Sequence, residues 1–279
     1  MIRPNNSAQF NVAIRTVLID KKSKQAEYGV GGGIVWDSAS ASEYEECQVK
    51  ARVLLNQYQD FKLLETLLWK PKEGYFLLDR HLQRLQQSAD YFQFPLDLAL
   101  VEKQLSAKAN TLKNYPYKIR LLISKNEQIV IEAITLSEKI TKKNENKTIT
   151  LGIATQSIEI KNPFLYHKTT NRDIYRLARQ SQPNCDDVLL WNDRQEITES
   201  CIANVVFKIE DQLLTPPVEC GLLAGTFRNY LLEKKKIKES KVKLTDLKHC
   251  ESIYLINSVR KWQRATIVNQ ELAHQELGK

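Results

Sequence analysis

The sequence has no apolar run near the roughly 18 to 20 residues that a membrane-spanning helix needs. Its first ten residues, MIRPNNSAQF, also lack the apolar stretch of a secretory signal. These two absences predict a cytoplasmic protein that does not bind a membrane.

Closely spaced cysteines and metal-ligand patterns are missing as well. The five cysteines form no CxxC pair, and the four histidines show no metal-ligand spacing. This predicts reduced thiols, with neither a disulfide framework nor a metal centre. The cysteines are Cys47, Cys185, Cys201, Cys220 and Cys250.

The formal net charge is +8, and much of the excess lies in two basic runs at 142–147 and 233–243. Neither run has interleaved aromatic residues or a nucleic-acid motif, so we expect solvated surface rather than nucleic-acid binding. A positive field would still help to attract a small anionic substrate.

The chain has 279 residues, 42% hydrophobic and 27% charged, which is typical of a folded soluble protein. Composition and pattern change near residue 56. Residues 10–20 and 28–37 predict strands and 43–57 a helix, a set too small to enclose a core. We therefore expect residues 1–56 to form a segment separate from the rest.

Two subdomains are expected after residue 60, at 61–140 and 148–279. In the first, LLETLLW and YFLL predict a hairpin, Asp79 is expected to cap a helix, and 97–112 predict a second helix. In the second, strands alternate irregularly with helices up to SIYLINSV, the expected final strand. The mixture lacks strict βαβ alternation, so an α+β fold is favoured.

Lys168, in YHKTTNR, and Glu199, in EITESCIANVVF, are candidates for cofactor chemistry. Taken alone, Lys168 is more simply interpreted as a surface cation, because lysine is usually exposed, and Glu199 is compatible with a plain turn residue. In a cofactor site, the Glu199 carboxylate would instead pair with a protonated pyridine nitrogen.

A phosphate site is suggested by GLLAGTFRNYLL, where Gly225 and Thr226 lie at the transition from a loop to a helix. Free backbone N–H groups and the positive end of a helix bind anions. Arg84 would add a bidentate contact, although an exposed helical arginine is the plainer interpretation.

Together these segments resemble the fold-type IV pyridoxal-phosphate (PLP) enzymes, which include branched-chain and D-amino-acid aminotransferases and aminodeoxychorismate lyase. The resemblance spans about residues 61–270 and rests on six ordered pieces. They are LLETLLW, HLQRL, HKTTNR, ITESCIANVVF, LLAGTFR and INSVR.

The resemblance implies a PLP site in a cleft between the two subdomains. Lys168 would form the Schiff base with PLP, Glu199 would pair with the pyridine nitrogen, and Arg84 would bind the phosphate. The rest of the phosphate site would come from three consecutive residues, Gly225, Thr226 and Phe227.

The N-terminal pieces FNVAIRT, YGVGGGIVWDS and EYEECQVKA resemble the end of component I of aminodeoxychorismate synthase, a chorismate-binding enzyme. By that resemblance, Arg15 and Lys50 belong to a chorismate site and Glu46 is a magnesium ligand. Only the final stretch of that domain is present, so we expect a truncated tail without synthase activity.

This fusion favours aminodeoxychorismate lyase, which converts 4-amino-4-deoxychorismate to 4-aminobenzoate and pyruvate. Asn257, Ser258 and Arg260 would lie near the substrate, with Arg260 binding a carboxylate. Thr66 is a candidate near the reacting atoms, or a buried strand threonine. A class IV aminotransferase of branched-chain or D-amino acids and an inactive fragment of a synthase–lyase fusion remain alternatives.

The expected assembly also follows from the resemblance. It implies a homodimer whose partner contributes to the pocket. A glutamine amidotransferase or a synthase is a further expected partner.

Overall fold

The computed structural model describes residues 16–30 and 60–136, residues 148–268, and a few isolated positions between 36 and 47. The chain divides into two compact units, Met1–Asp60 and Phe61–Lys279. Within the described residues, no helix combines the length and the hydropathy that crossing a membrane requires.

The first unit contains an antiparallel hairpin of strands β1 (Thr16–Asp20) and β2 (Gln25–Gly29). The Asp20 carboxylate closes its turn by accepting hydrogen bonds from the Lys22 amide at 2.8 Å and the Ser23 hydroxyl at 2.7 Å. The second strand starts earlier than the predicted position 28, because the turn comes directly after Asp20.

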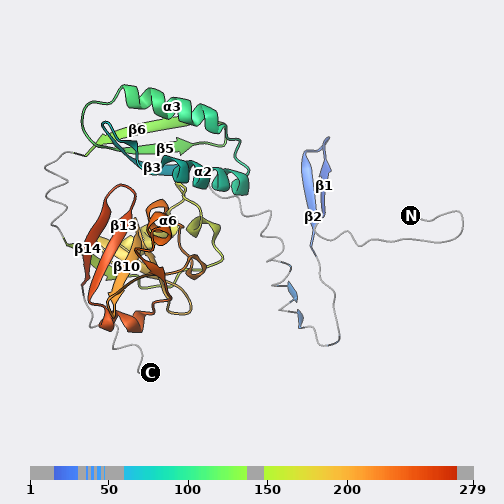
Figure 1. Ribbon diagram of the computed structural model, residues 1–279. Coiled ribbons are helices and arrows are strands. Elements are labelled where there is room, and N and C mark those ends of the chain that lie inside the picture. The colour runs from blue at the N-terminus through green and yellow to red at the C-terminus, as the bar shows by residue number, and fades with distance from the viewer. Residues whose placement is uncertain are drawn as a thin grey trace, which may run out of the picture. The chain divides into compact units, whose positions relative to one another are not determined.

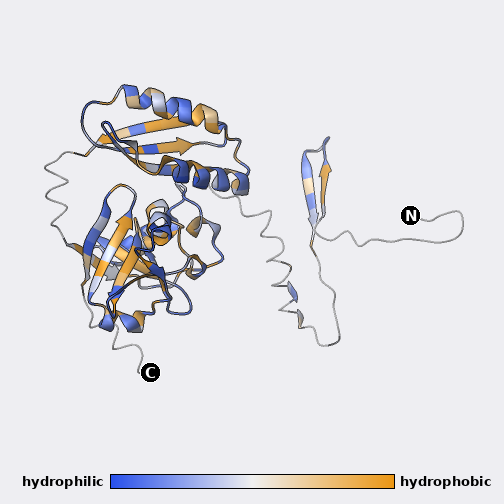
Figure 2. Ribbon diagram, in the orientation of Figure 1, coloured by the Kyte–Doolittle hydropathy of each residue, from blue (hydrophilic) through white to orange (hydrophobic). Residues whose placement is uncertain are grey.

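The second unit begins with a four-stranded antiparallel sheet (Figure 1). Its strands, in spatial order, are β4 (Gly74–Tyr75), β3 (Leu63–Lys70), β5 (Tyr117–Ile123) and β6 (Ile129–Thr135). The helices α2 (Leu78–Phe92) and α3 (Leu98–Asn110) pack against it. The visible face of α2 is largely hydrophilic (Figure 2), as expected for an amphipathic helix with one buried face.

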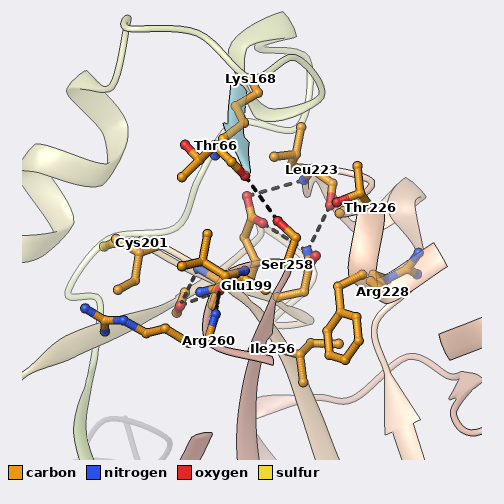
Figure 3. A pocket seen from close by; sticks show the side chains of 18 of the residues that line it. Thr66, Lys168, Glu199, Cys201, Leu223, Thr226, Arg228, Ile256, Ser258 and Arg260 are labelled. Carbon is orange, nitrogen blue, oxygen red and sulfur yellow. Dashed lines mark hydrogen bonds between the residues drawn. The ribbon is translucent and has the colours of Figure 1, made fainter. Parts of the chain in front are cut away.

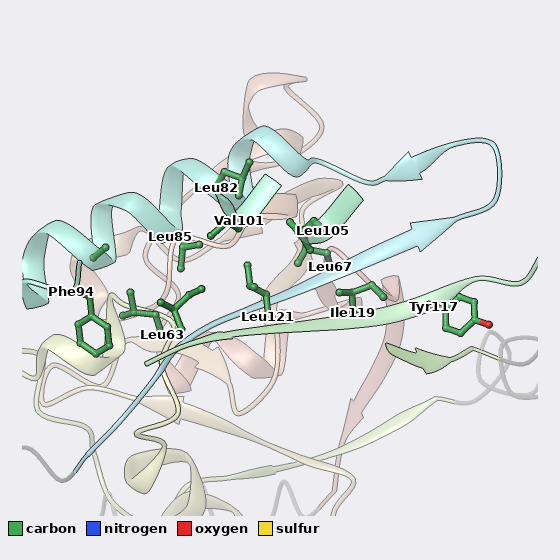
Figure 4. Packing of buried hydrophobic residues seen from close by; sticks show 12 residues of the cluster. Leu63, Leu67, Leu82, Leu85, Phe94, Val101, Leu105, Tyr117, Ile119 and Leu121 are labelled. Carbon is green, nitrogen blue, oxygen red and sulfur yellow. The ribbon is translucent and has the colours of Figure 1, made fainter. Parts of the chain in front are cut away.

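The core of this part joins leucines of the strands to leucines of the helices (Figure 4). Leu63 and Leu67 of β3 are fully buried, and Leu85 of α2 is 1% exposed. Burying one such side chain contributes about 1.5–3 kcal/mol. The apolar face of α2, with Leu82, Leu85 and Ala89, therefore holds the helix on the sheet.

The expected cap of α2 is wrong. The helix starts after Leu77, which has a left-handed backbone with φ 57° and forms no side-chain cap. Asp79 lies in the first turn, where its charge suits the positive end of the helix dipole. In α3, by contrast, the Asp97 side chain accepts a hydrogen bond from the Leu100 amide at 3.1 Å.

An eight-stranded mixed sheet forms the remainder. In spatial order the strands are β12 (Lys238–Glu239), β11 (Gln212–Thr215), β10 (Asn204–Ile209), β13 (Ser252–Asn257), β14 (Lys261–Ile267), β7 (Ile149–Ile153), β8 (Asp187–Trp191) and β9 (Ile197–Ser200). The pairs β14–β7 and β7–β8 are parallel, whereas β11–β10, β10–β13 and β13–β14 are antiparallel.

Some elements of this part were not anticipated. The last strand is β14 rather than SIYLINSV, and helix α5 (Asp173–Ser181) follows the Lys168 segment. A further helix, α6 (Thr226–Glu233), starts where GLLAGTFR predicted it. Short 3₁₀ turns occur at Pro163–Leu165, Val218–Cys220 and Leu244–His249.

The chain around Lys168 pairs with β3 of the smaller sheet. The Leu64 amide donates to the Lys168 carbonyl at 3.0 Å, and the Thr170 amide donates to the Lys62 carbonyl at 2.9 Å. These backbone bonds fix Lys168 between the two sheets.

Candidate active site

A cavity of about 360 Å³ is lined by residues from both sheets and from the loops between them. All ten residues that the sequence assigned to cofactor, catalysis or substrate line it. They are Thr66, Arg84, Lys168, Glu199, Gly225, Thr226, Phe227, Asn257, Ser258 and Arg260.

Lys168 reaches into this cavity as a half-buried side chain. Burial lowers the pKa of its amine to about 8, and the positive charge of Arg84 acts in the same direction. The carboxylates of Glu65 and Glu199 offset part of this effect. An amine with this pKa is partly neutral near pH 7, as a nucleophile or a base must be.

Glu199 is a buried carboxylate with three hydrogen-bond donors. The Tyr175 hydroxyl donates at 2.8 Å and the Asn204 amide at 3.1 Å. The Leu223 backbone N–H donates at 3.3 Å (Figure 3). Burial raises the pKa of Glu199 to about 7, although these donors and the charge of Lys168 favour its ionised form. A cationic ring nitrogen at this position would relieve the cost of ionising it.

Arg84 is held by a second buried carboxylate, Glu65, which is 1% exposed. The Arg84 guanidinium donates to it from Nε at 2.8 Å and from Nη2 at 2.7 Å. Burial raises the pKa of Glu65, but the charge of Arg84 and the hydrogen bonds from His81 and Arg84 outweigh burial and bring it to about 2. Glu65 is therefore ionised and orients Arg84 along the cavity wall.

The N-terminus of α6 forms an anion-binding end of the cavity. Gly225 is its N-cap, and Thr226 and Phe227 are its first two residues, with backbone N–H groups not used within the helix. Gly225 packs so closely on Asn204 that a Cβ has no room there. Together with the Arg84 guanidinium, this arrangement fits the phosphate group of PLP.

Three cations line another part of the cavity, namely Lys118 and Arg120 of β5 and Arg260 after β13. Burial lowers the pKa of Lys118, and the charges of Arg120 and Arg260 lower it further. Arg120 also pairs with Glu132 at 2.9 Å. This group gives the cavity a positive region distinct from Arg84.

The turn that carries Arg260 is ordered by its neighbours. The Asn257 side chain accepts hydrogen bonds from the Val259 amide at 3.1 Å and the Arg260 amide at 2.8 Å. The Ser258 hydroxyl donates to the Thr66 carbonyl at 3.2 Å (Figure 3). The turn is thereby tied to β3, and Thr66 faces the cavity from that strand.

Several site residues were not identified from the sequence. Tyr175 and Asn204 hold Glu199, and Arg172 lies with its guanidinium carbon 4.3 Å from the centre of the Tyr175 ring. The signal available for Arg172 was its place in HKTTNR, four residues after Lys168. Asn204 carried no comparable signal, since its role depends on the loop that contributes Leu223.

The predicted chorismate-site residues Arg15, Glu46 and Lys50 lie outside the described residues. The homodimer, the amidotransferase or synthase partner and the cytoplasmic location remain predictions.

Comparison with known proteins gives the family. The model for "Amino-transferase class IV" matches residues 62–268, and the model for "chorismate binding enzyme" matches residues 1–56. The chain belongs to the class IV aminotransferase family and carries an N-terminal chorismate-binding segment.

Two curated relatives are lyases by name. A Schizosaccharomyces pombe protein named "Putative aminodeoxychorismate lyase" is 32% identical over 221 residues, covering 76% of this chain and 92% of that protein. The aminodeoxychorismate lyase of Saccharomyces cerevisiae is 26% identical over 263 residues, covering 73% of this chain and 70% of that protein.

Solved structures share the fold. A "Putative amino-acid aminotransferase" from Mesorhizobium loti superposes with a TM-score of 0.69 at 32% identity, over 75% of this chain and all of that one. A hypothetical aminotransferase from Mycobacterium tuberculosis, in its PLP-bound form, gives a TM-score of 0.65 at 20% identity, over 77% and 83% of the two chains. Members of the family and its structural neighbours bind PLP.

Proposed function

We propose that this protein is a PLP-dependent aminodeoxychorismate lyase, which converts 4-amino-4-deoxychorismate to 4-aminobenzoate and pyruvate. The observation that carries the proposal is one cavity lined by the Lys168 amine and the Glu199 carboxylate, together with an anion-binding end and a second group of cations. The two relatives named as lyases support the choice of reaction.

In this proposal Lys168 carries the cofactor, Glu199 holds its pyridine nitrogen, and Arg84 and Thr226 bind its phosphate. Bound PLP would supply an electron sink for negative charge that develops next to the substrate nitrogen. The hydrogen bonds from Tyr175 and Asn204 fix the Glu199 carboxylate, so that it need not reorganise when it pairs with a cationic ring.

The Lys168 amine, whose place on the cofactor the substrate amine would take, then acts as the base. It removes the proton from the ring carbon that bears the amino group, and breaking the adjacent carbon–oxygen bond to the enolpyruvyl group makes the ring aromatic. The protonated amine returns the proton to the departing pyruvate enolate, so that one substrate yields one molecule of each product. The pKa of about 8 suits both directions of transfer near neutral pH.

The cations Lys118, Arg120 and Arg260 match the charge of this substrate, which carries two carboxylates. Guanidinium groups bind carboxylates in a fixed fork geometry, whereas an ammonium group offers a compact charge. We assign the substrate carboxylates to this part of the cavity. Thr66, next to it on β3, would contact the substrate ring.

Amino-group transfer is the second candidate function. It would use the same Lys168, Glu199 and Arg84, and is supported by the name of a Thermotoga maritima relative, "Probable branched-chain-amino-acid aminotransferase", 27% identical over 168 residues. The two candidates differ in the substrate that the cationic region accepts.

The products of two parallel assays separate these candidates. The chain is supplied with PLP and either 4-amino-4-deoxychorismate or a branched-chain amino acid with 2-oxoglutarate. The lyase predicts 4-aminobenzoate and pyruvate in equal amounts and no more than trace glutamate. Glutamate formation with no 4-aminobenzoate would assign the chain to amino-group transfer instead.

A further inference from the structure

A buried chain of hydrogen bonds leads from the smaller sheet to the anion-binding end of the cavity. His81 Nδ1 lies 2.7 Å from Glu65 Oε2, and His81 Nε2 lies 3.2 Å from the Thr226 hydroxyl. Glu65 and His81 are each 1% exposed, and Thr226 is 4% exposed. His81 is thus enclosed between a carboxylate and a hydroxyl that faces the cavity.

The proton positions in this chain follow from what each group can donate. An ionised Glu65 can only accept, so Nδ1 of His81 carries a proton. If His81 is neutral, its Nε2 accepts the proton of the Thr226 hydroxyl. The hydroxyl proton then points away from the cavity, and a bound anion would meet the lone pairs of Thr226.

We propose that His81 is a positioning residue for a phosphate or sulfate dianion bound at Arg84 and Thr226, and that it takes up one proton when the anion binds. With His81 protonated, Nε2 donates to the Thr226 oxygen, and the Thr226 proton is free to point at the anion. The cofactor phosphate as natural ligand rests on the proposed function. The coupling itself rests only on these residues.

The groups that face His81 determine when this uptake occurs. Glu65 comes from β3, Arg84 from α2 itself, Lys168 from the segment paired with β3, and Thr226 from α6. Burial lowers the pKa of His81, Glu65 opposes this, and the charges of Arg84 and Lys168 lower it further. His81 is therefore neutral at pH 7 before binding, and the negative charge of an anion favours its protonation.

Calorimetric titration of the full chain with sulfate, without PLP, tests the coupling. Sulfate stays a dianion across neutral pH, so its own protonation does not contribute. Titrations at pH 7 in two buffers of different ionisation enthalpy give the number of protons taken up. Glu199 and Lys168 also face the cavity, so the informative quantity is the uptake that a variant loses.

We expect His81→Gln and Thr226→Val to lose most of one proton of uptake. Each should also bind sulfate about tenfold more weakly, the fold-change of one hydrogen bond to a charged group. Thr226→Val leaves the Glu65–His81 pair intact, so it answers the question if His81→Gln does not fold. His167→Gln is the matched control, because this half-buried histidine bonds Ser88 at 3.1 Å instead.

Equal proton uptake in wild type, His81→Gln and Thr226→Val would overturn the coupling. A spectroscopic titration with PLP separates this result from failure of the proposed cofactor. Sulfate-linked uptake through His81 without any PLP binding would leave the inference standing and remove the cofactor. PLP binding with no loss of proton uptake in either variant would leave the proposed cofactor standing and remove the coupling through His81.

Discussion

Gly225 and Asn204 lie so close that a Cβ on the glycine would be 1.9 Å from the Asn204 side-chain oxygen. The same Asn204 amide group donates to the Glu199 carboxylate at 3.1 Å and to the Leu223 carbonyl at 2.9 Å. The Asn204 side chain therefore connects the carboxylate that is proposed to pair with the pyridine nitrogen to the loop that is proposed to bind the phosphate.

Gly225→Ala is expected to push Asn204 away from Glu199 and from the loop. Overpacking of this kind costs about 1–3 kcal/mol of folding free energy. We expect a lower melting temperature and weaker PLP binding in a spectroscopic titration. The double variant Gly225→Ala/Asn204→Ala, which restores the space, should recover part of the stability. An unchanged melting temperature in Gly225→Ala would contradict the packing described.

Glu65→Gln is expected to destabilise the protein and to weaken PLP binding, because Arg84 loses its ionised partner. Breaking a buried ion pair costs about 3–5 kcal/mol. Chemical denaturation measures this loss. The matched control is Asp173→Asn, which breaks an exposed pair with Arg176 at 3.1 Å and should leave stability nearly unchanged. Equal effects of the two substitutions would show that Glu65 does not hold Arg84 as described.

Glu199 gives a pH dependence with a definite sign. Its pKa is raised from 4.5 to about 7 in the folded protein, so the unfolded chain loses this proton first as the pH rises. The cofactor-free protein therefore loses stability from Glu199 between about pH 4.5 and 7, and no more above this range. Glu199→Gln should lack this component, so its stability relative to wild type should rise across the window. A constant difference across the window would argue against the raised pKa.

Substitution of Glu199 also tests its proposed role in turnover. With PLP bound, Glu199→Gln should lower turnover at least about tenfold, or ~1.4 kcal/mol of transition-state stabilisation, since glutamine cannot balance a cationic ring nitrogen. Unchanged turnover in a variant that binds PLP normally would remove Glu199 from that role.

Much of the site could be predicted because its residues lie in ordered segments with fixed spacing. Lys168, Glu199 and Gly225-Thr226 line one cavity, as their motifs implied. The partners that orient them could not be predicted in the same way. His81 and Thr226, for example, are 145 positions apart and meet only because α2 and α6 pack together. The i, i+3 spacing of His81 and Arg84 on α2 was the one local hint.

In the fold, too, some elements could be predicted from the sequence and others could not. Helix α3 could be predicted to within two residues, because Asp97 caps it and its two buried residues, Val101 and Leu105, are four positions apart on one helix face. Strand β14 was missed because KWQRATI has few apolar residues and includes Gln263, which is 8% exposed. That strand is specified by its pairing with both β13 and β7, which sequence alone does not display.

Lys168 should capture PLP with a pH dependence set by its own pKa. Capture requires the neutral amine, so it should rise with pH, pass its midpoint near the pKa of about 8, and level off above it. Borohydride reduction followed by peptide mapping measures the fraction of Lys168 that carries the pyridoxyl group. Lys168→Ala should show no label at this peptide, and Lys118→Ala should label normally. A midpoint near the ordinary lysine value of 10.5 would contradict the lowered pKa of Lys168.

The most direct test of the proposed lyase is the formation of fluorescent 4-aminobenzoate from 4-amino-4-deoxychorismate by the purified chain with PLP. We predict product from wild type, with an equal amount of pyruvate, and none above background from Lys168→Ala. Wild-type protein that shows the visible absorbance of bound PLP but forms no 4-aminobenzoate would contradict the lyase. Product formed equally by Lys168→Ala would contradict the role of Lys168.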